Sequence, residues 1–572
     1  MAIFSFALNF IGFLLTRIYI PAGCTWVLSR YVIKAPPISF AAEVIASFFT
    51  AILFLPIIFS VSFINLSVRY VLSLYLKAKY HDKIWLMAGR DSFVSHDEYA
   101  NSCNHYSLYV LKGKCDLRKI QNKFDSILQE KDGKGEVVYD RMKRRLVRKF
   151  GYYCWEHLGE SFDITQHVKY LIGDENTVLT EDQVFDELKK MYDYPLEGDK
   201  PQWEILVIPK YVYKIHLRNS RLNNAIVEDC SIETDSLEPE CNNNVTGSIN
   251  GNSLQDSPND AHYAFIVRMH HSIMDGISAG NALQHYMADK KMKLTVDPLS
   301  ASHQLPLWKI FVAYAQVILC GPRAFFKTAL LDETNCFHGP KLTGPKTLSW
   351  SRQVNVDALR RVKDATRTSV TAVLVSCLGG SVRNLAMKRG LPIPTRVHAF
   401  PTIGILPFPD IKPRNRFTMA LLPLCIGLET GLERLKSAQR SLKDLLSSPD
   451  VLLNYHLMQV IGVLPVQIIN FFIDLCHATL LLSNVPGPAE RATLFGGDEV
   501  TDIGIWAPIQ LGIGIGMSLF SYGGIVRATV VTDKVACPSS SDVPTIIEEF
   551  EKEIINLTKS AGVHESEVFV SD

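Results

Sequence analysis

The hydrophobic pattern begins with a run of 25 residues, Val44 to Val68, that contains no charged side chain. As a helix at about 1.5 Å per residue it would reach about 37 Å, more than the roughly 30 Å of hydrocarbon in a bilayer. Pro56 near its middle allows either a kinked span or a hairpin that re-enters from one side. The alternative is a buried hydrophobic hairpin of a soluble protein, which the length disfavours. We predict a membrane-anchoring region over residues 1–83, with the span or hairpin at about 44–68.

The flanks of this run indicate its orientation. Met1 to Thr16 is also uncharged, but it lacks the positive n-region of a secretory signal, so we expect it to associate with the membrane. Basic residues lie on both sides of the long run, with Arg17, Arg30 and Lys34 before it and Arg69, Lys77, Lys79 and Lys83 after it. The positive-inside rule therefore favours a cytosolic main body.

Beyond Lys83 the apolar positions follow the mixed periods of an α/β protein with mixed sheets. Asp116 can cap a helix, and Thr180 and Gln183 have the spacing of a capping box. The pattern predicts strands at Tyr106–Leu111, Trp203–Ile208, Tyr263–Met269, Val397–Thr402 and Phe417–Cys425, and helices after Asp116, after Thr180, at Val370–Met387 and at Pro544–Leu557. The chain is therefore predicted to alternate strands with amphipathic helices.

A chain of 572 residues exceeds one core, at roughly 100 to 200 residues per domain. We predict a first α/β half over 84–300, a crossover linker over 301–346, a second half over 347–560 and a tail over 561–572. In the linker, Leu307 to Phe326 is apolar but interrupted by Gly321 and Pro322, and a buried linker helix is favoured over a helix that touches the membrane.

Residues Asn219 to Asp260 break the pattern, with nine Asn, six Ser, eight acidic residues and no aromatic residue. Such a segment cannot bury enough apolar surface to order itself. We predict a disordered insertion at 219–260 between two strands.

Composition excludes some functions. The 59 Lys and Arg balance 58 Asp and Glu, so no overall field favours nucleic acid as a partner. The twelve cysteines contain no C-x-x-C pair, which argues against a zinc site or a redox motif. We expect mostly reduced, buried thiols in a cytosolic environment and no metal.

The most informative segment is the heptad His270-His271-Ser272-Ile273-Met274-Asp275-Gly276, between a predicted strand and a predicted helix. A strand-to-helix turn can project side chains into a cleft while rigid elements hold them. Imidazole titrates near neutrality, as a base that takes a proton from an alcohol should.

Three other interpretations of the heptad compete with catalysis. A lone histidine beside an apolar strand is more often a hydrogen-bonded core residue. A metal site of His270, His271 and Asp275 is disfavoured because adjacent strand residues point to opposite faces. A turn in which Asp275 caps the next helix and Gly276 supplies an unusual dihedral is compatible with catalysis.

The heptad matches H-H-x-x-x-D-G and resembles the active-site motif of the wax ester synthase/diacylglycerol acyltransferase family. Pro201-Gln202-Trp203-Glu204 is similar to that family's Pro-Leu-Trp-Glu segment, and Leu482-Ser483-Asn484-Val485-Pro486-Gly487-Pro488 to its S-N-V-P-G-P turn. Gly496-Gly497, Ser521-Tyr522-Gly523-Gly524 and Asp533 follow in the family's order. The resemblance covers roughly Lys83 to Leu557. It departs at Thr371-Ala372, where the family usually has Asn-Asp, and no D-F-G-W-G of the plant alcohol acyltransferase branch is present.

The resemblance implies a two-half, CoA-dependent acyltransferase-like (chloramphenicol acetyltransferase-like) fold with a tunnel between the halves. It implies that His271 is the general base, with His270 supporting, Asp275 and Gly276 holding the turn, and Asn484 a weaker candidate for polarising the intermediate. It implies acyl-CoA as co-substrate, no cofactor, and a fatty alcohol or diacylglycerol as acceptor, wax ester synthesis being slightly favoured.

Two other functions stay open at this stage. A catalytically silent, membrane-tethered lipid-binding protein is motivated by Thr371-Ala372 and the long insertion. A soluble transferase acting on small polar alcohols is disfavoured by the apolar run. We expect the endoplasmic reticulum membrane, or lipid droplets if Val44 to Val68 forms a hairpin.

Overall fold

The computed structural model describes residues 40–97, 102–159, 162–213, 261–293, 295, 307–329, 335–338, 342–405, 411–474, 478–510 and 512–570. The predicted membrane-associated segment Met1 to Thr16 and the predicted insertion at 219–260 lie outside these residues.

The first sheet runs in the order β16-β17-β2-β9-β7-β5. Its strands are β2 Asn104–Lys112, β5 Val168–Tyr170, β7 Trp203–Ile208, β9 His262–His270, β16 Thr493–Leu494 and β17 Asp498–Trp506. The central strand β9 pairs antiparallel with β2 and β7, and both of its faces are covered, which explains the continuous apolar run from Tyr263 to Val267. Two strands from late in the chain, β16 and β17, complete this sheet beside β2.

Helices and small sheets surround the first sheet. The helices are α4 Gly89–Phe93, α5 Leu117–Gln129, α6 Glu181–Asp193, α8 Gly276–Ala282, the π-helical turn Leu283–Met287 and the 3₁₀ turns Asp140–Lys143 and Ile164–Gln166. The small sheets are β1-β4-β3, formed by Ile84–Leu86, Tyr152–His157 and Arg144–Lys149, and β6-β8, formed by Val178–Thr180 and Lys210–Val212. As predicted, Asp116 caps α5 and Thr180 with Gln183 forms a capping box on α6.

The second sheet has eight strands, six of them in the order β10-β19-β18-β15-β12-β13. They are β10 Lys346–Trp350, β11 Val354–Asn355, β12 Val397–Gly404, β13 Phe417–Met419, β14 Leu422–Leu424, β15 Leu480–Pro486, β18 Ile515–Tyr522 and β19 Ile525–Asp533. The single strand predicted at Phe417–Cys425 is wrong, because β13 and β14 are separate strands that pair with different parts of β12. The buried ion pair Arg527–Asp502 joins β19 to β17 and so ties the two sheets together.

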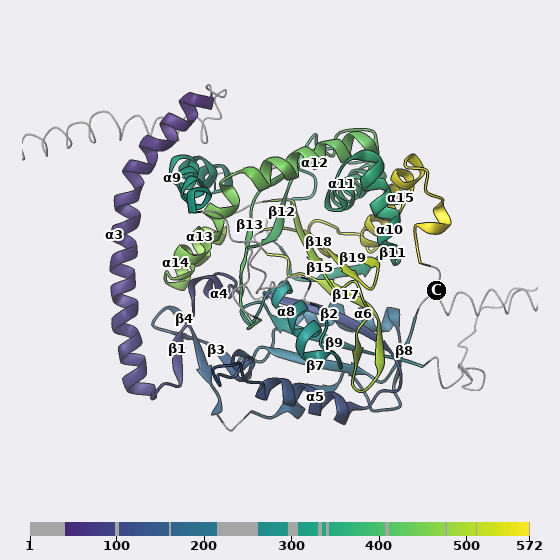
Figure 1. The fold of residues 1–572 in the computed structure, drawn as a ribbon, viewed down its shortest axis with the longest axis horizontal. Coiled ribbons are helices and arrows are strands. Elements are labelled where there is room, and N and C mark those ends of the chain that lie inside the picture. The colour runs from purple at the N-terminus through teal and green to yellow at the C-terminus, as the bar shows by residue number, and fades with distance from the viewer. Residues whose placement is uncertain are drawn as a thin grey trace, which may run out of the picture.

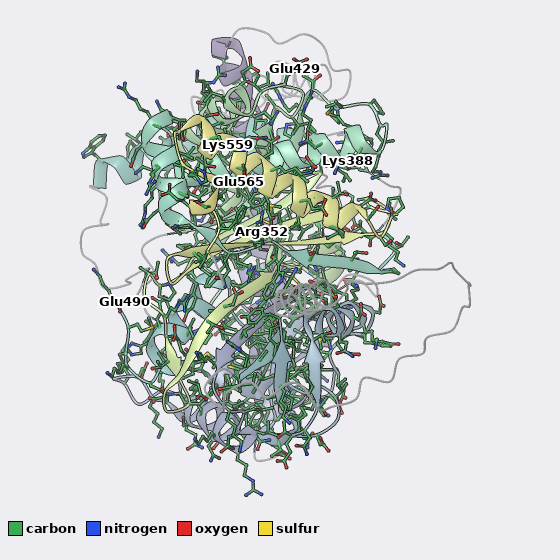
Figure 2. All side chains as sticks on the ribbon, turned by 90° about the vertical axis from the view of Figure 1, so that its right-hand side faces the viewer. Arg352, Lys388, Glu429, Glu490, Lys559 and Glu565 are labelled. Carbon is green, nitrogen blue, oxygen red and sulfur yellow. The ribbon has the colours of Figure 1, made fainter. Side chains whose placement is uncertain are left out.

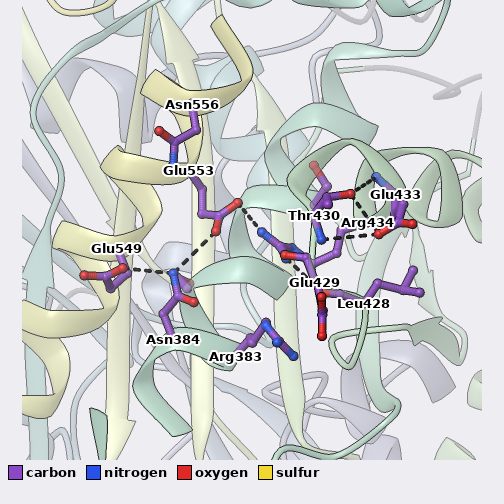
Figure 3. A network of polar contacts seen from close by, with 12 residues as sticks. Arg383, Asn384, Leu428, Glu429, Thr430, Glu433, Arg434, Glu549, Glu553 and Asn556 are labelled. Atoms are coloured by element: carbon purple, nitrogen blue, oxygen red, sulfur yellow. Dashed lines mark hydrogen bonds and ion pairs between the residues drawn. The ribbon is translucent and has the colours of Figure 1, made fainter. Parts of the chain in front are cut away.

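Helices α10 Val356–Thr366, α11 Val370–Lys388, α12 Gly431–Ser447 and α15 Asp542–Ser560 cover the second sheet, with the short turn Glu565–Glu567 after them. Figure 3 shows the polar network that fixes three of these helices. Arg434 of α12 pairs with Glu553 of α15, and Asn384 of α11 donates to Glu549 at 2.9 Å. Helix α11 is apolar and long enough to cross a membrane, yet it is mostly buried in this layer and is a core helix.

Helix α3, Phe40–Tyr80, contains the predicted membrane segment and lies along one side of the molecule (Figure 1). It runs through Pro56 without a break, which removes the hairpin alternative. Its C-terminal part is docked on the body, where Leu76 is fully buried and Asn65 donates to the carbonyl of Val463 at 2.9 Å. Its other faces expose apolar side chains such as Phe63, at 73%. A buried hairpin of a soluble protein is therefore contradicted.

A second apolar layer lies beside α3, formed by α9 Leu307–Ala329, α13 Asp450–Gly462 and α14 Val466–Asp474 (Figure 1). Helix α9 continues through Gly321 and Pro322 and packs against α3 and α13. The prediction of a buried linker helix is wrong, because Trp308 and Phe311 are 64% and 75% exposed.

Candidate active site

The heptad occupies the predicted strand-to-helix turn. Strand β9 ends at His270, and α8 begins at Gly276. The backbone N–H of His271 donates to the carbonyl of Cys103 at 2.8 Å, and that of His270 donates to the carbonyl of Gln202 at 2.9 Å. Gln202 belongs to the Pro-Gln-Trp-Glu segment, so two motifs that are far apart in the sequence meet at the turn.

Asn415 orients the imidazole of His271. Its Nδ2 faces three acceptors, namely Oδ1 of Asp91 at 3.0 Å and the carbonyl oxygens of His271 at 2.9 Å and Ser272 at 3.3 Å. Because all three atoms accept hydrogen bonds, they fix Nδ2 on their side and Oδ1 toward the ring. This Oδ1 lies 3.0 Å from Nδ1 of His271. The proton therefore sits on Nδ1, and Nε2 carries the lone pair.

The support of Asn415 extends one step further. Asp91, buried in α4, pairs with Arg141 at 2.8 Å. Arg141 also donates to the carbonyl of Ile273, within the heptad, at 3.3 Å. The orienting amide is thus held by a charged group that is itself paired, which limits rotation of the His271 ring.

His271 lines a cavity of about 100 Å³ between the two sheets. The cavity also touches Asp275 and Gly276 of the heptad, Asn484 of β15 and Phe417 of β13. Part of the His271 side chain is accessible there, but the surrounding protein still lowers its pKa to about 4, chiefly by desolvation. Half-buried His105, whose ring centroid lies 5.8 Å from that of His271, has its pKa lowered to about 3 for the same main reason. His271 is therefore neutral at physiological pH.

Asp275 is engaged with backbone rather than with the imidazole. Its Oδ1 accepts from the N–H of Ser278 at 2.8 Å, which caps α8, and its Oδ2 accepts from the N–H of Arg416 at 2.7 Å. Burial raises the pKa of this carboxyl group, although both backbone hydrogen bonds oppose the shift. The carboxylate joins the heptad to the loop that carries Asn415, so it positions the residue that orients His271.

His270 is buried and is not among the residues that line the His271 cavity. Its Nδ1 lies 2.7 Å from Oγ of Ser272, and its Nε2 lies 3.3 Å from Oδ1 of Asp97. Burial alone would raise the pKa of Asp97, but the interactions with His270 and the N–H of Cys103 lower it below its ordinary value. The supporting role of His270 stays a prediction.

Gly276 and Asn484 bring the heptad and the S-N-V-P-G-P strand together. A Cβ on Gly276 would lie 3.0 Å from Cγ2 of Val485, so the missing side chain lets α8 approach β15. The Nδ2 of Asn484 donates to Oγ1 of Thr371 at 3.2 Å. Thr371, which departs from the family pattern, thus still provides a polar partner at the start of α11.

Other chemistries find little support at this site. The thiol of Cys103 lines the cavity, but burial raises its pKa well above the ordinary value, so it is not a thiolate nucleophile. Within the ranges that the structure describes, no group of three or more His, Cys, Asp or Glu side chains could hold a metal ion.

Sequence reasoning missed Asn415, Asp91 and Arg141. Asn415 lies in an irregular loop before β13, and 324 residues separate it from Asp91. The only available signal was the polar triplet Arg414-Asn415-Arg416 ahead of an apolar strand, which does not by itself indicate a site.

Comparisons with known proteins place this geometry in a family context. Residues 414–557 match the WS/DGAT C-terminal domain family. No curated protein sequence matches this chain. The structure of a wax ester synthase/diacylglycerol acyltransferase from Marinobacter aquaeolei VT8 is similar, with a TM-score of 0.51 and 16% identity over 83% of this chain and 98% of that one.

Two further structures share the fold. The trichothecene 15-O-acetyltransferase from Fusarium sporotrichioides has a TM-score of 0.51 and 10% identity over 83% of this chain and 95% of that one. The starter condensation domain of rhizomide synthetase, in complex with C8-CoA and Leu-SNAC, has a TM-score of 0.50 and 9% identity over 87% and 100%. The predicted two-half fold is thereby confirmed. The chain shares the fold of these structures, and its residues 414–557 match the WS/DGAT C-terminal domain family that its motifs resemble.

Proposed function

We propose that the protein is an O-acyltransferase that moves a long-chain acyl group from acyl-CoA to a lipid alcohol, with His271 as general base. The observation that carries this proposal is the neutral imidazole of His271, which lines the cavity and has its Nδ1 proton fixed by Asn415. A base needs an unprotonated nitrogen with a fixed orientation, and both conditions are met at Nε2. The WS/DGAT domain and the acyltransferase fold support the same reaction class.

In the proposed reaction, Nε2 of His271 takes the proton of the acceptor hydroxyl while that oxygen attacks the thioester carbonyl. The tetrahedral oxyanion then collapses, the C–S bond breaks, and Nε2 returns the proton to the departing CoA thiolate. Negative charge on the intermediate favours imidazolium beside it, which offsets the low pKa of the resting ring. Asn484 is proposed to polarise the intermediate, because it lines the same cavity and its Nδ2 has a second N–H besides the one that it donates to Thr371.

The acceptor proposed is a fatty alcohol, giving a wax ester, or diacylglycerol, giving triacylglycerol. The apolar face of α3 supports a lipid membrane as the place where acceptor and enzyme meet. The side of the molecule that Figure 2 faces carries ion pairs around α15, with Arg352, Lys388 and Lys559 each paired with a glutamate. We propose the endoplasmic reticulum membrane, with the catalytic body in the cytosol.

The test is acyl-CoA turnover by membranes that contain the full chain, with hexadecanol and diacylglycerol offered in parallel. The wild type should form an ester with at least one of them, and His271→Ala should lower the rate about 10²- to 10⁴-fold, the usual contribution of a general base. No ester with either acceptor would reject the proposal.

The alternative is a membrane-tethered lipid-binding protein without turnover. The observation that favours it is Thr371-Ala372 at the start of α11, where the family pattern has Asn-Asp. In that case the wild type and His271→Ala would both release CoA only at the background rate.

A further inference from the structure

A second cavity of about 70 Å³ lies behind the one that His271 lines. It lies between the second sheet on one side and the helical layer of α9, α13 and α14 on the other. Its walls include Phe325 of α9, Leu457 and Met458 of α13, Phe472 of α14, Phe400 of β12 and Met419 of β13.

The lining of this cavity fits hydrocarbon rather than a polar group. Among the side chains that line it, only Thr328 and Asn454 are polar. The amide of Asn454 already donates to the carbonyl of Met419 at 2.9 Å. An apolar ligand gains free energy by filling such a site, whereas a charged head group would lose its hydration there.

The two cavities share a wall. Met419 lines both of them, and Phe93 of the second cavity is followed in the chain by Val94 of the first. Val94, Cys103, Phe417 and Met458 pack into one small apolar cluster with Phe93 and Met419 against it. Methionine is flexible and adapts to irregular space, and Met419 is the side chain that the two cavities share.

The outer side of the second cavity faces the apolar surface of the molecule. The helices that enclose it expose Trp308, Phe311, Ile468 and Phe471 on their outer faces. Helix α9 packs against α3, and α13 and α14 lie on the same side of the molecule as these two helices (Figure 1). A patch of this kind marks contact with a membrane or an apolar partner.

We infer that the second cavity holds the hydrocarbon chain of the lipid alcohol, which enters from the bilayer between α9, α13 and α14. The hydroxyl end then passes Met419 and reaches Nε2 of His271, while acyl-CoA occupies the cavity from the other side. This inference rests on the proposed function. It assigns the acceptor chain to a site formed by the helical layer and leaves the cavity between the sheets to the reacting groups.

Occupancy can be tested without turnover. The full-length His271→Ala protein in phospholipid nanodiscs is irradiated with a long-chain alcohol that carries a diazirine at its tail end, and labelled peptides are mapped. We expect labels on α13 near Leu457 and on α9 near Phe325, reduced at least tenfold by excess hexadecanol. Labelling of these peptides by a diazirine acyl-CoA instead would assign the cavity to the acyl chain and overturn the inference.

A kinetic test follows the chain length of the acceptor. Leu457→Trp fills the cavity, and Val460→Trp, on the exposed side of the same helix, is the matched control. Losing contact with about two methylene groups should raise KM for hexadecanol about tenfold in Leu457→Trp only, with KM for a short-chain alcohol changed less than twofold. Equal behaviour of the two variants would overturn the inference, and labelling of His271→Ala decides if Leu457→Trp fails to fold. Absence of turnover in the wild type would reject the proposed function alone, because the labelling result does not depend on it.

Discussion

The surroundings of His271 and the outer helical layer both depart from the ordinary distribution of side chains, in which polar groups are exposed and large apolar groups are buried. Next to His271, polar groups such as Asp91 and Asn415 are buried. On α3 and α9, large apolar groups such as Phe63 and Phe311 are exposed. Exposed single apolar residues are common in proteins, whereas buried polar groups and large exposed apolar patches are informative. The cost of burying polar groups near His271 is offset by the hydrogen bonds and the ion pair that they form. In our proposal, the cost of exposing apolar groups on the outer layer is removed by contact with a bilayer.

The largest effect expected is the loss of ester formation when the hydrogen bond between Asn415 and His271 is removed. Asn415→Leu keeps the side-chain size but removes the acceptor that fixes the Nδ1 proton, and it takes one donor from Asp91. Because the wrong tautomer of His271 cannot accept the proton at Nε2, kcat for ester formation should fall at least about 10²-fold. The measurement is acyl-CoA turnover with hexadecanol.

A matched control separates this effect from a loss of stability. Asn384→Leu removes a comparable amide from the network that joins α11 to α15 (Figure 3), and Asn384 is not among the residues that line the cavity. It should lower the midpoint of thermal unfolding and leave kcat within about twofold. Equal kcat values for Asn415→Leu and Asn384→Leu would contradict an orienting role for Asn415.

The next effect concerns the outer layer. Phe59→Arg with Phe63→Arg places two charges on the exposed face of α3, at a cost of about 2.5 to 3.5 kcal/mol for each one at the bilayer centre. Most of the protein should then leave the membrane pellet after an alkaline carbonate wash, while kcat on a short-chain alcohol changes little. Retention of the double variant in the pellet would show that α3 does not insert through this face.

The sequence predicted local structure well where short-range physics decides it. The capping residues Asp116 and Thr180 and the strand Trp203–Ile208 lie where the pattern placed them. It failed where contacts between distant segments decide. Leu307 to Phe326 is predicted to form a buried linker helix, but its Trp308 and Phe311 are exposed. An apolar composition alone does not distinguish a helix buried in the core, such as α11, from one on an exposed apolar surface.

The site shows the same division. The heptad identified the turn from local sequence, and Asp275 caps α8 as the turn interpretation expected. The residue that orients His271, however, comes from a loop 144 residues later, and the backbone N–H that Asp275 accepts from Arg416 lies in the same loop. No periodicity in the sequence encodes such long-range pairings. Likewise, β17 joins the first sheet from the second half of the chain, an exchange that a division into consecutive halves does not anticipate.

The smallest effect expected is that of pH, and its absence near neutrality is the informative result. Desolvation lowers the pKa of His271 to about 4, so the ring stays a neutral base as the pH falls through 6.5, the ordinary value for histidine. The kcat/KM of the wild type, which reports the free enzyme, should therefore change less than about twofold between pH 8 and pH 5.5 and fall below pH 5, as Nε2 becomes protonated. The unfolded chain binds protons at this histidine between about pH 6.5 and 4 that the folded protein does not, so stability also decreases over that window. Circular dichroism at each pH separates the loss of activity from the loss of folded protein. A fall in kcat/KM around pH 6.5 with the fold intact would mean that the surrounding protein does not desolvate His271, and so would contradict the closed polar surroundings that set this site apart from the exposed outer layer.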